Sequence, residues 1–241
     1  MTSPTALVFP IEQLVSALQF QGIDVLVDGA HAPGMLPLNL NQLGAAYYTG
    51  NLHKWVCTPK GAAFLHVRGD KQEGLAPTSI SHGLNSGRTD RSRFRLLFDW
   101  TGTTDPSAWL SVPAAIDTVG AMAPDGWDEV MRRNHELAIA GREVVLEKLG
   151  LEAPAPAEMI GSMASIVLPD RVGAIADPMV FADALHDILW ENHRIEIPVP
   201  PWPAAPKRMV RLSAQLYNSI EQYDRLAEAI TIELKHESLG I

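Results

Sequence analysis

Two short stretches of the sequence carry side chains that can do chemistry at a cofactor or metal. Asp28-Gly29-Ala30-His31 follows a short apolar run. A carboxylate there can bind a protonated ring nitrogen or a metal, or it can cap an Asp-Gly turn. His53-Lys54 stands before the apolar Trp55-Val56. A lysine amine kept from water has a lowered pKa and attacks carbonyl groups to form a Schiff base, whereas an exposed loop lysine does neither.

Two further stretches contain groups that suit anions. The hydroxyl-rich Thr101-Gly102-Thr103 precedes a predicted helix, and free N–H groups at a helix start can hold a phosphate or simply be capped. Arg211 lies in the middle of the apolar run "MVRLSAQLYN". An arginine at such a position needs an anionic partner, which is either a substrate carboxylate or an acidic side chain of the protein itself.

The elements that must position these groups alternate in type. Apolar residues at helical spacing predict a helix over 10–21, and short apolar runs predict strands over 23–28, 45–49 and 61–69. This order predicts an α/β sheet covered on both faces. Ligands of open α/β sheets bind beyond the carboxyl ends of the strands, which is where Asp28 lies.

The rest of the chain predicts a long loop over 70–99 with a short strand near Phe94–Phe98, and a helix after Asp105. A long helix follows over Trp127–Leu149. Beyond it the pattern predicts a strand over 164–168, a helix over 178–190, two strands over 194–198 and 209–214, and a final helix over 220–235. We therefore expect part of an α/β large domain in residues 1–125 and a small α+β domain in residues 126–241.

Composition excludes several classes of protein. A formal net charge of −9 argues against binding to nucleic acid and against docking on an anionic membrane. The single cysteine, Cys57, excludes an internal disulfide and suits a reducing compartment. The sequence shows neither a run long enough to span a membrane nor a signal peptide, so a cytoplasmic location is expected.

Taken together and in order, the motifs "VDGAHAPG", "YYTGNLHKWVCTPKGAAFLHVR", "WTGTTDP" and "VRLSAQLYN" resemble the class V aminotransferase family of pyridoxal-phosphate enzymes. The likeness is to its isopenicillin N epimerase-like branch, and it covers essentially the whole chain. The resemblance implies an aspartate aminotransferase-like fold of the pyridoxal-phosphate transferases. It also implies an amino-acid substrate and the cofactor pyridoxal 5'-phosphate.

The resemblance also assigns roles to residues. It makes Lys54 the catalytic residue that forms the aldimine with the cofactor, and it pairs Asp28 with the ring nitrogen. It puts His31 near the ring, and His53 with Asn51 near the phosphate. The resemblance also assigns Thr103 to the phosphate of a neighbouring subunit's cofactor, which implies a homodimer. It assigns Arg211 to the substrate carboxylate. The implied reaction at the α-carbon is epimerisation or transamination.

Alternatives stay open at this point. The family's N-terminal part of the large domain is not recognisable, so we expect a truncated chain, and an inactive remnant is one alternative. A metal-dependent hydrolase using Asp28, His31 and His53 is another, although the sequence has no tight ligand motif. Cysteine desulfurase activity is disfavoured because it needs a cysteine on a mobile loop, whereas Cys57 directly follows the lysine motif.

Overall fold

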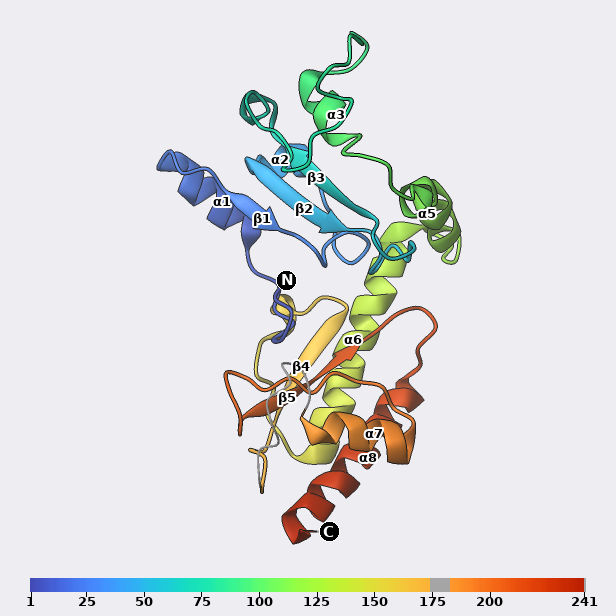
Figure 1. Cartoon of the computed structure of the whole chain (residues 1–241). Coiled ribbons are helices and arrows are strands. Elements are labelled where there is room, and N and C mark those ends of the chain that lie inside the picture. The colour runs from blue at the N-terminus through green and yellow to red at the C-terminus, as the bar shows by residue number, and fades with distance from the viewer. Residues whose placement is uncertain (174–182, 241) are drawn as a thin grey trace. The chain divides into compact units, whose positions relative to one another are not determined.

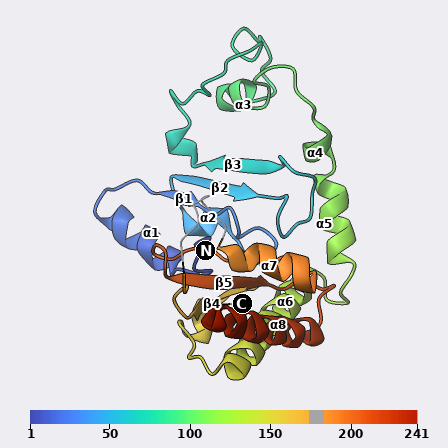
Figure 2. The ribbon, with the colours of Figure 1, turned by 60° about the horizontal axis from the view of Figure 1, so that its bottom comes forward.

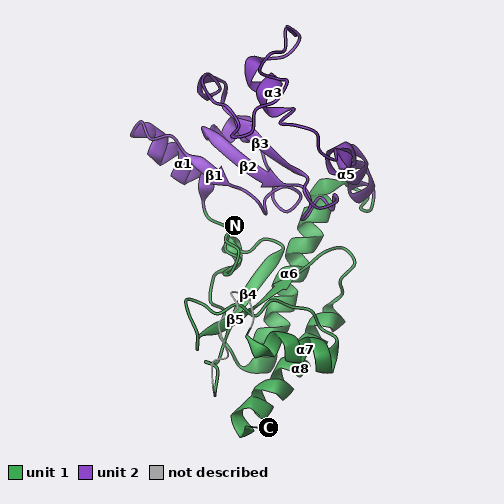
Figure 3. Ribbon diagram, in the orientation of Figure 1, with its two compact units in different colours: residues 1–9, 122–241 green, residues 10–121 purple. Residues whose placement is uncertain are grey.

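A computed structural model describes residues 1–173 and 183–240. The chain divides into two compact units (Figure 3). Unit 2 comprises Pro10–Ala121, and unit 1 comprises Met1–Phe9 together with Met122–Ile241. The first nine residues thus belong with the C-terminal unit, whereas the sequence-based division put them in the first domain.

Unit 2 contains a three-stranded sheet of β1 (Leu26–Asp28), β2 (Tyr47–Asn51) and β3 (Ala63–Val67). β1 and β2 are parallel, with Asp28 opposite Thr49, and β3 runs antiparallel to β2 (Figure 1). Helix α1 (Ile11–Phe20) begins after Pro10, and α2 (Leu40–Leu43) is capped by the Asn39 side chain. The three expected strands are therefore present. β1 and β3 are shorter than their apolar runs, and β2 begins two residues later than predicted.

The core of unit 2 lies on one face of this sheet. Val15 of α1 packs there with Val27 and Tyr48 of the strands. On the other side, the side chains of Leu26 and Leu65 are 66% and 41% exposed. The prediction of a sheet covered on both faces is therefore wrong for this chain.

The second half of unit 2 departs from the sequence prediction at one point. The predicted strand near Phe94–Phe98 is a helix, α3 (Arg93–Phe98), so that prediction is wrong. Ser92 caps this helix by accepting a hydrogen bond from the backbone N–H of Arg95, and the rings of Phe94 and Phe98 meet at i,i+4 spacing, 4.6 Å apart. The remaining elements of this half are η1 (Gly69–Lys71), α4 (Ser107–Leu110) and α5 (Val112–Gly120).

Unit 1 packs three helices and a two-stranded antiparallel ribbon around one core (Figures 1 and 2). The helices are α6 (Trp127–Leu149), α7 (Ala184–His193) and α8 (Ile220–Leu239), and the strands are β4 (Met163–Leu168) and β5 (Arg208–Ser213), with a short η2 (Ala157–Met159) before β4. α6 has the predicted bounds and ends at Gly150 in the left-handed conformation. The predicted start of α7, residues 178–182, lies outside the described residues.

The strand predicted over 194–198 does not form, and that prediction is wrong. Arg194 ends α7 in the left-handed conformation, with φ of 57°. The segment after Arg194 lies beside β5 but is joined to it only by isolated backbone hydrogen bonds. One of these runs from the Arg211 N–H to the Pro198 carbonyl, at 3.1 Å. Prolines at 198, 200 and 201 remove the donors that a regular ladder would need.

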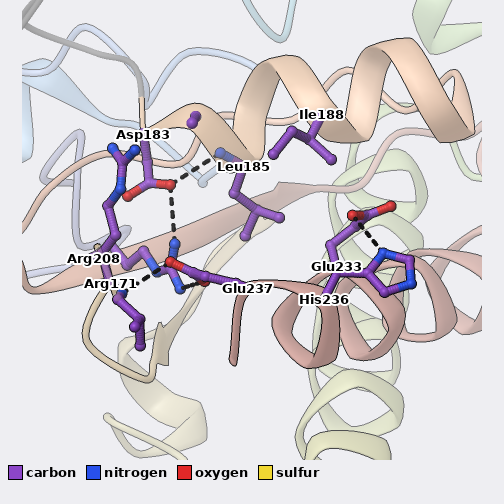
Figure 4. A pocket seen from close by; sticks show the side chains of 10 residues that line it. Arg171, Asp183, Leu185, Ile188, Arg208, Glu233, His236 and Glu237 are labelled. Carbon is purple, nitrogen blue, oxygen red and sulfur yellow. Dashed lines mark hydrogen bonds and ion pairs between the residues drawn. The ribbon is translucent and has the colours of Figure 1, made fainter. Parts of the chain in front are cut away.

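A buried arginine ties the ribbon of unit 1 to two of its helices (Figure 4). Arg208 of β5 is 2% exposed and pairs with Asp183 at 3.0 Å and with Glu237 of α8. Asp183 also caps α7 by accepting from the Leu185 N–H. Because each charge has a partner, the buried cation is compensated and fixes where α7 and α8 lie on the strand.

Candidate active site

The turn after β1 carries the first two predicted site residues. Oδ1 of Asp28 accepts a hydrogen bond from the Ala30 N–H at 3.0 Å, and the Gly29 N–H bonds to the Thr49 carbonyl at 2.9 Å. The turn-capping interpretation of Asp28 is therefore confirmed. The Asp28 side chain is also exposed, so it remains accessible to a ligand at the carboxyl end of the parallel pair.

Tyr48 lies against this turn and was not singled out from the sequence. A Cβ atom added to Gly29 would lie 2.0 Å from the Tyr48 hydroxyl oxygen, so only glycine fits there. Burial, together with the negative charge of Asp28, raises the pKa of Tyr48 to about 12. The phenol therefore stays protonated beside the carboxylate. The side chains of a strand point alternately to its two faces, so the predicted strand over 45–49 already put Tyr47 and Tyr48 on opposite faces, but the sequence did not show which one is buried.

The second predicted motif occupies the connection between β2 and β3, residues 52–62, which we call the lysine loop. The loop is closed at its base, where the Leu52 N–H bonds to the Ala62 carbonyl at 2.9 Å, and further in, where the Thr58 N–H bonds to the Leu52 carbonyl. Trp55 and Val56 are buried. These anchors hold the backbone on both sides of Lys54, whose side chain is half-buried.

The structure brings Lys54 and His31 together. Lys54 Nζ lies 3.0 Å from His31 Nε2, although the two residues are 23 positions apart. An ammonium donating to a neutral imidazole, or an imidazolium donating to a neutral amine, satisfies this contact equally. The pair can therefore share one proton, which allows Lys54 to present a neutral amine as a nucleophile.

The neighbouring residues of the motif are held by the base of the same loop. His53 Nδ1 lies 2.9 Å from the Ala62 carbonyl, so this nitrogen carries the hydrogen and Nε2 is left for another partner. Asn51 is the last residue of β2 and pairs with Ala63. Nothing in this geometry tests the predicted phosphate contacts of His53 and Asn51.

Thr103 and Arg211 lie elsewhere in the chain. Thr103 is exposed in the turn before α4, which has only four residues. Asp105 supports that turn by accepting from the Ser107 N–H at 2.9 Å. Arg211 belongs to β5 of unit 1, where its Nη1 donates to the Ser3 carbonyl at 2.5 Å and to the Ser3 hydroxyl at 3.0 Å. Within the described residues, Arg211 has no carboxylate within ion-pairing distance.

The metal-dependent alternative gains no ligand set from the structure. In the part of the chain that the structure describes, no three histidine, cysteine, aspartate or glutamate side chains gather closely enough to hold a metal ion. Likewise, no helix among the described residues is long and apolar enough to cross a membrane.

Comparison with known proteins places this site in a family. The family model for class V aminotransferases matches residues 2–226. The chain is 34% identical over 240 residues to "Probable L-cysteine desulfhydrase, chloroplastic" of Arabidopsis thaliana, covering 95% of this chain and 49% of that protein. It is 33% identical over 242 residues to isopenicillin N epimerase of Streptomyces clavuligerus, covering 95% of this chain and 58% of that protein.

The fold agrees with this placement. The apo cysteine desulfurase of Thermococcus onnurineus NA1 matches with a TM-score of 0.71 at 19% identity, over 98% of this chain and 58% of that one. At that identity the likeness shows the fold alone, which is the α/β architecture of pyridoxal-phosphate transferases. The chain belongs to the class V aminotransferase family, whose members depend on pyridoxal phosphate. It spans about half the length of the relatives that it matches.

The residues present fit that cofactor. An aldehyde needs an amine, which Lys54 supplies beside His31, and a protonated ring nitrogen needs a carboxylate, which Asp28 supplies. Next to the lysine, the indole N–H of Trp55 is buried and has no hydrogen-bond partner within the described residues, so it is a donor available to a bound group. The donor set therefore matches the chemistry of pyridoxal phosphate.

Proposed function

We propose that this chain is a pyridoxal-phosphate-dependent enzyme, or part of one, that acts at the α-carbon of an amino acid by epimerisation or transamination. The contact between Lys54 Nζ and His31 Nε2 at 3.0 Å, in a loop anchored by buried side chains, is the observation that supports it most strongly. It joins an amine to a base in the loop to which the family resemblance assigns the cofactor.

Each residue has a proposed task. Lys54 would hold the cofactor through its aldehyde group, and its Nζ atom would move the α-proton of the substrate. His31 Nε2 holds or accepts a proton from that amine, and Asp28 keeps the ring nitrogen protonated. Bound pyridoxal phosphate would supply an electron sink for the negative charge left on the α-carbon.

The remaining assignments are proposals of the same kind. Asn51 and His53 contact the cofactor phosphate, and Arg211 binds the substrate carboxylate. Thr103 reaches the phosphate in a neighbouring subunit of a homodimer, and the cytoplasm is the proposed location. Sedimentation of the purified protein tests the dimer, because a monomer that carries full activity would contradict shared sites.

Titration with pyridoxal phosphate tests the central proposal. The wild-type protein should develop the visible absorption band of an amine-linked cofactor, and borohydride reduction should fix the label on the peptide that contains Lys54. Lys54→Ala should abolish both signals. Lys60→Ala is the matched control, because Lys60 is an exposed lysine of the same loop and its loss should leave both signals intact. Absence of the band in the wild-type chain would favour the inactive remnant.

The reaction type is decided by products. The family relatives include an epimerase and a desulfhydrase by name, and loss of the α-proton is a step that epimerisation, transamination and elimination have in common. Exchange of the α-hydrogen with deuterated water should therefore occur with a suitable amino acid and fail in Lys54→Ala. Inverted amino acid, keto acid or released sulfide then separates the three reactions, and sulfide alone would contradict the proposed epimerisation or transamination.

A further inference from the structure

A cavity of about 370 Å³ in unit 1 is lined by an excess of positive charge. It lies between the segment after α7, the end of β5 and the first turns of α8. Its charged lining residues are Arg194, Arg211, Arg225 and Glu196, three arginines against one glutamate. The net charge of these lining residues is therefore opposite in sign to the formal net charge of the chain, which is −9.

Protein carboxylates do not neutralise these arginines. Within the described residues, no carboxylate lies within 4.0 Å of any of the three guanidinium groups, whereas Arg208 on the same strand as Arg211 pairs with two acids. The contrast matters because the protein has ample acidic residues with which to pair a cation. The positive charge of the cavity is therefore left for a ligand.

The arginines are nevertheless held in place by uncharged groups. Arg225 Nη2 donates to the His193 carbonyl at 2.6 Å, and the Arg194 guanidinium lies over the Trp190 ring, 5.9 Å from its centroid. Arg211 donates to Ser3. These contacts orient the side chains without cancelling their charge.

The three arginines differ in burial. Arg211 is half-buried, burial lowers its pKa, and its Nε atom is buried with no hydrogen-bond partner within the described residues. Leaving a buried donor unpaired costs free energy, which a bound anion would recover. Arg194 and Arg225 are exposed, so solvent and salt screen their charges. The cavity thus has one partly buried cationic position, at Arg211, and one solvated position, at Arg194 and Arg225.

We infer that this cavity binds a small dicarboxylate, with one carboxylate at Arg211 and the other between Arg194 and Arg225. The volume lies near the lower end of the range for small-molecule sites, which limits the ligand to a few carbon atoms. Asn218 and Gln222 add hydrogen-bonding groups to the lining. One part of the inference rests on the proposed function, in which Arg211 binds the substrate carboxylate. In that case the substrate is an amino acid whose side chain also ends in a carboxylate.

Calorimetric titration with two probes of equal length tests the site without added cofactor. Glutarate and pentanoate both have five carbons, but only glutarate has two carboxylates. Glutarate should bind at least about tenfold more tightly, since a hydrogen bond to a charged group is worth about one such factor. The double variant Arg194→Gln/Arg225→Gln should lose about this factor for glutarate and leave pentanoate unchanged.

Variants of the partly buried position and a control complete the design. Arg211→Gln should weaken both probes, and Arg211→Lys should retain part of the binding if the first variant fails to fold. Arg132→Gln is the control, because Arg132 is an exposed arginine of α6 that already pairs with Glu136 at 2.7 Å. Equal affinity for the two probes, no binding of either, or unchanged glutarate binding in the double variant would overturn the inference.

The outcome is separable from that of the proposed function. The visible band of the cofactor is measured on the same protein samples. Dicarboxylate binding without a band would refute the proposed enzyme and leave the cavity as a binding site. A cofactor band without selective binding of the dicarboxylate would refute the inference about the cavity and leave the proposed enzyme standing.

Discussion

Gly29→Ala is the substitution whose effect the structure defines most sharply. The added Cβ would lie 2.0 Å from the hydroxyl oxygen of Tyr48 and 2.1 Å from its Cζ atom. Real Cβ contacts essentially never fall below 3.0 Å, so the hydroxyl must retreat by at least 1.0 Å. Tyr48 is 3% exposed and its ring stacks on Phe64, so that space is not free.

The cost follows from this lack of room. Forcing extra atoms into a packed core costs about 1–3 kcal/mol, and we expect the upper part of that range because the hydroxyl oxygen and two ring atoms of Tyr48 are involved. Tyr48→Phe should not relieve the strain, because Cζ remains in the way. Tyr48→Leu removes the ring, so in that background Gly29→Ala should cost about 1–2 kcal/mol less.

Hydrogen exchange provides a local assay, which suits a chain that divides into two compact units, because a single two-state unfolding free energy is not assured for such a chain. The Gly29 N–H is bonded to the Thr49 carbonyl, so peptides covering β1 and β2 report the opening of this turn. The same samples are titrated with pyridoxal phosphate, because the turn carries Asp28 and His31. Faster exchange and weaker cofactor binding should appear together.

Gly69→Ala is the matched control. A Cβ at Gly69 would meet no atom within 4 Å, and its backbone has no positive φ. This variant should therefore be neutral or more stable by about 0.4–1 kcal/mol, through a smaller loss of chain entropy. If Gly29→Ala and Gly69→Ala exchanged equally, the steric reasoning about the turn would be refuted.

Three further outcomes are expected. Gly141→Ala should lower the unfolding free energy of unit 1 by about 1–3 kcal/mol, because the added Cβ would lie 2.7 Å from the Tyr223 ring. A variant that unfolds in urea with the stability of the wild type would contradict this. Glu237→Gln should cost about 1–3 kcal/mol, because Arg208 keeps its pair with Asp183 but loses a hydrogen bond to a charged partner. Arg132→Gln should change urea unfolding little. Burial raises the pKa of Tyr48 and of Tyr223 from 10.0 to about 12. The part of the folding stability that depends on their neutral phenols is therefore complete below pH 10 and is lost as the pH rises from 10 to 12. An ultraviolet titration in which both phenols of the folded protein ionise at pH 10 would exclude this.

Much of the architecture could be predicted from the sequence because its signals are local. The helix over Trp127–Leu149 shows apolar residues at helical spacing and a glycine just beyond its end, and the structure has the same bounds. The strands β4 and β5 and the helix α8 also lie close to their predicted ranges. The residue types of the lysine motif and the Asp28 turn likewise pointed to the family that the comparisons show.

Other features depended on competition between local signals. Phe94–Phe98 is a short, largely apolar run that suits a strand, but the capping side chain of Ser92 and the i,i+4 ring pair favour the helix α3. The segment over 194–198 is apolar enough for a strand. There the left-handed Arg194 and the following prolines prevent a regular ladder. Propensity alone cannot weigh these contributions against one another.

The sequence by itself determined which chemical groups this protein has, and most of the order of its helices and strands. Only the tertiary structure decided which groups meet. His31 approaches Lys54 across 23 residues, Tyr48 fills the space that Gly29 leaves, and Arg211 bonds to Ser3 across 208 residues. Such contacts arise from the packing of distant segments, where distances of a few tenths of an ångström matter, and no local pattern of residue types encodes them.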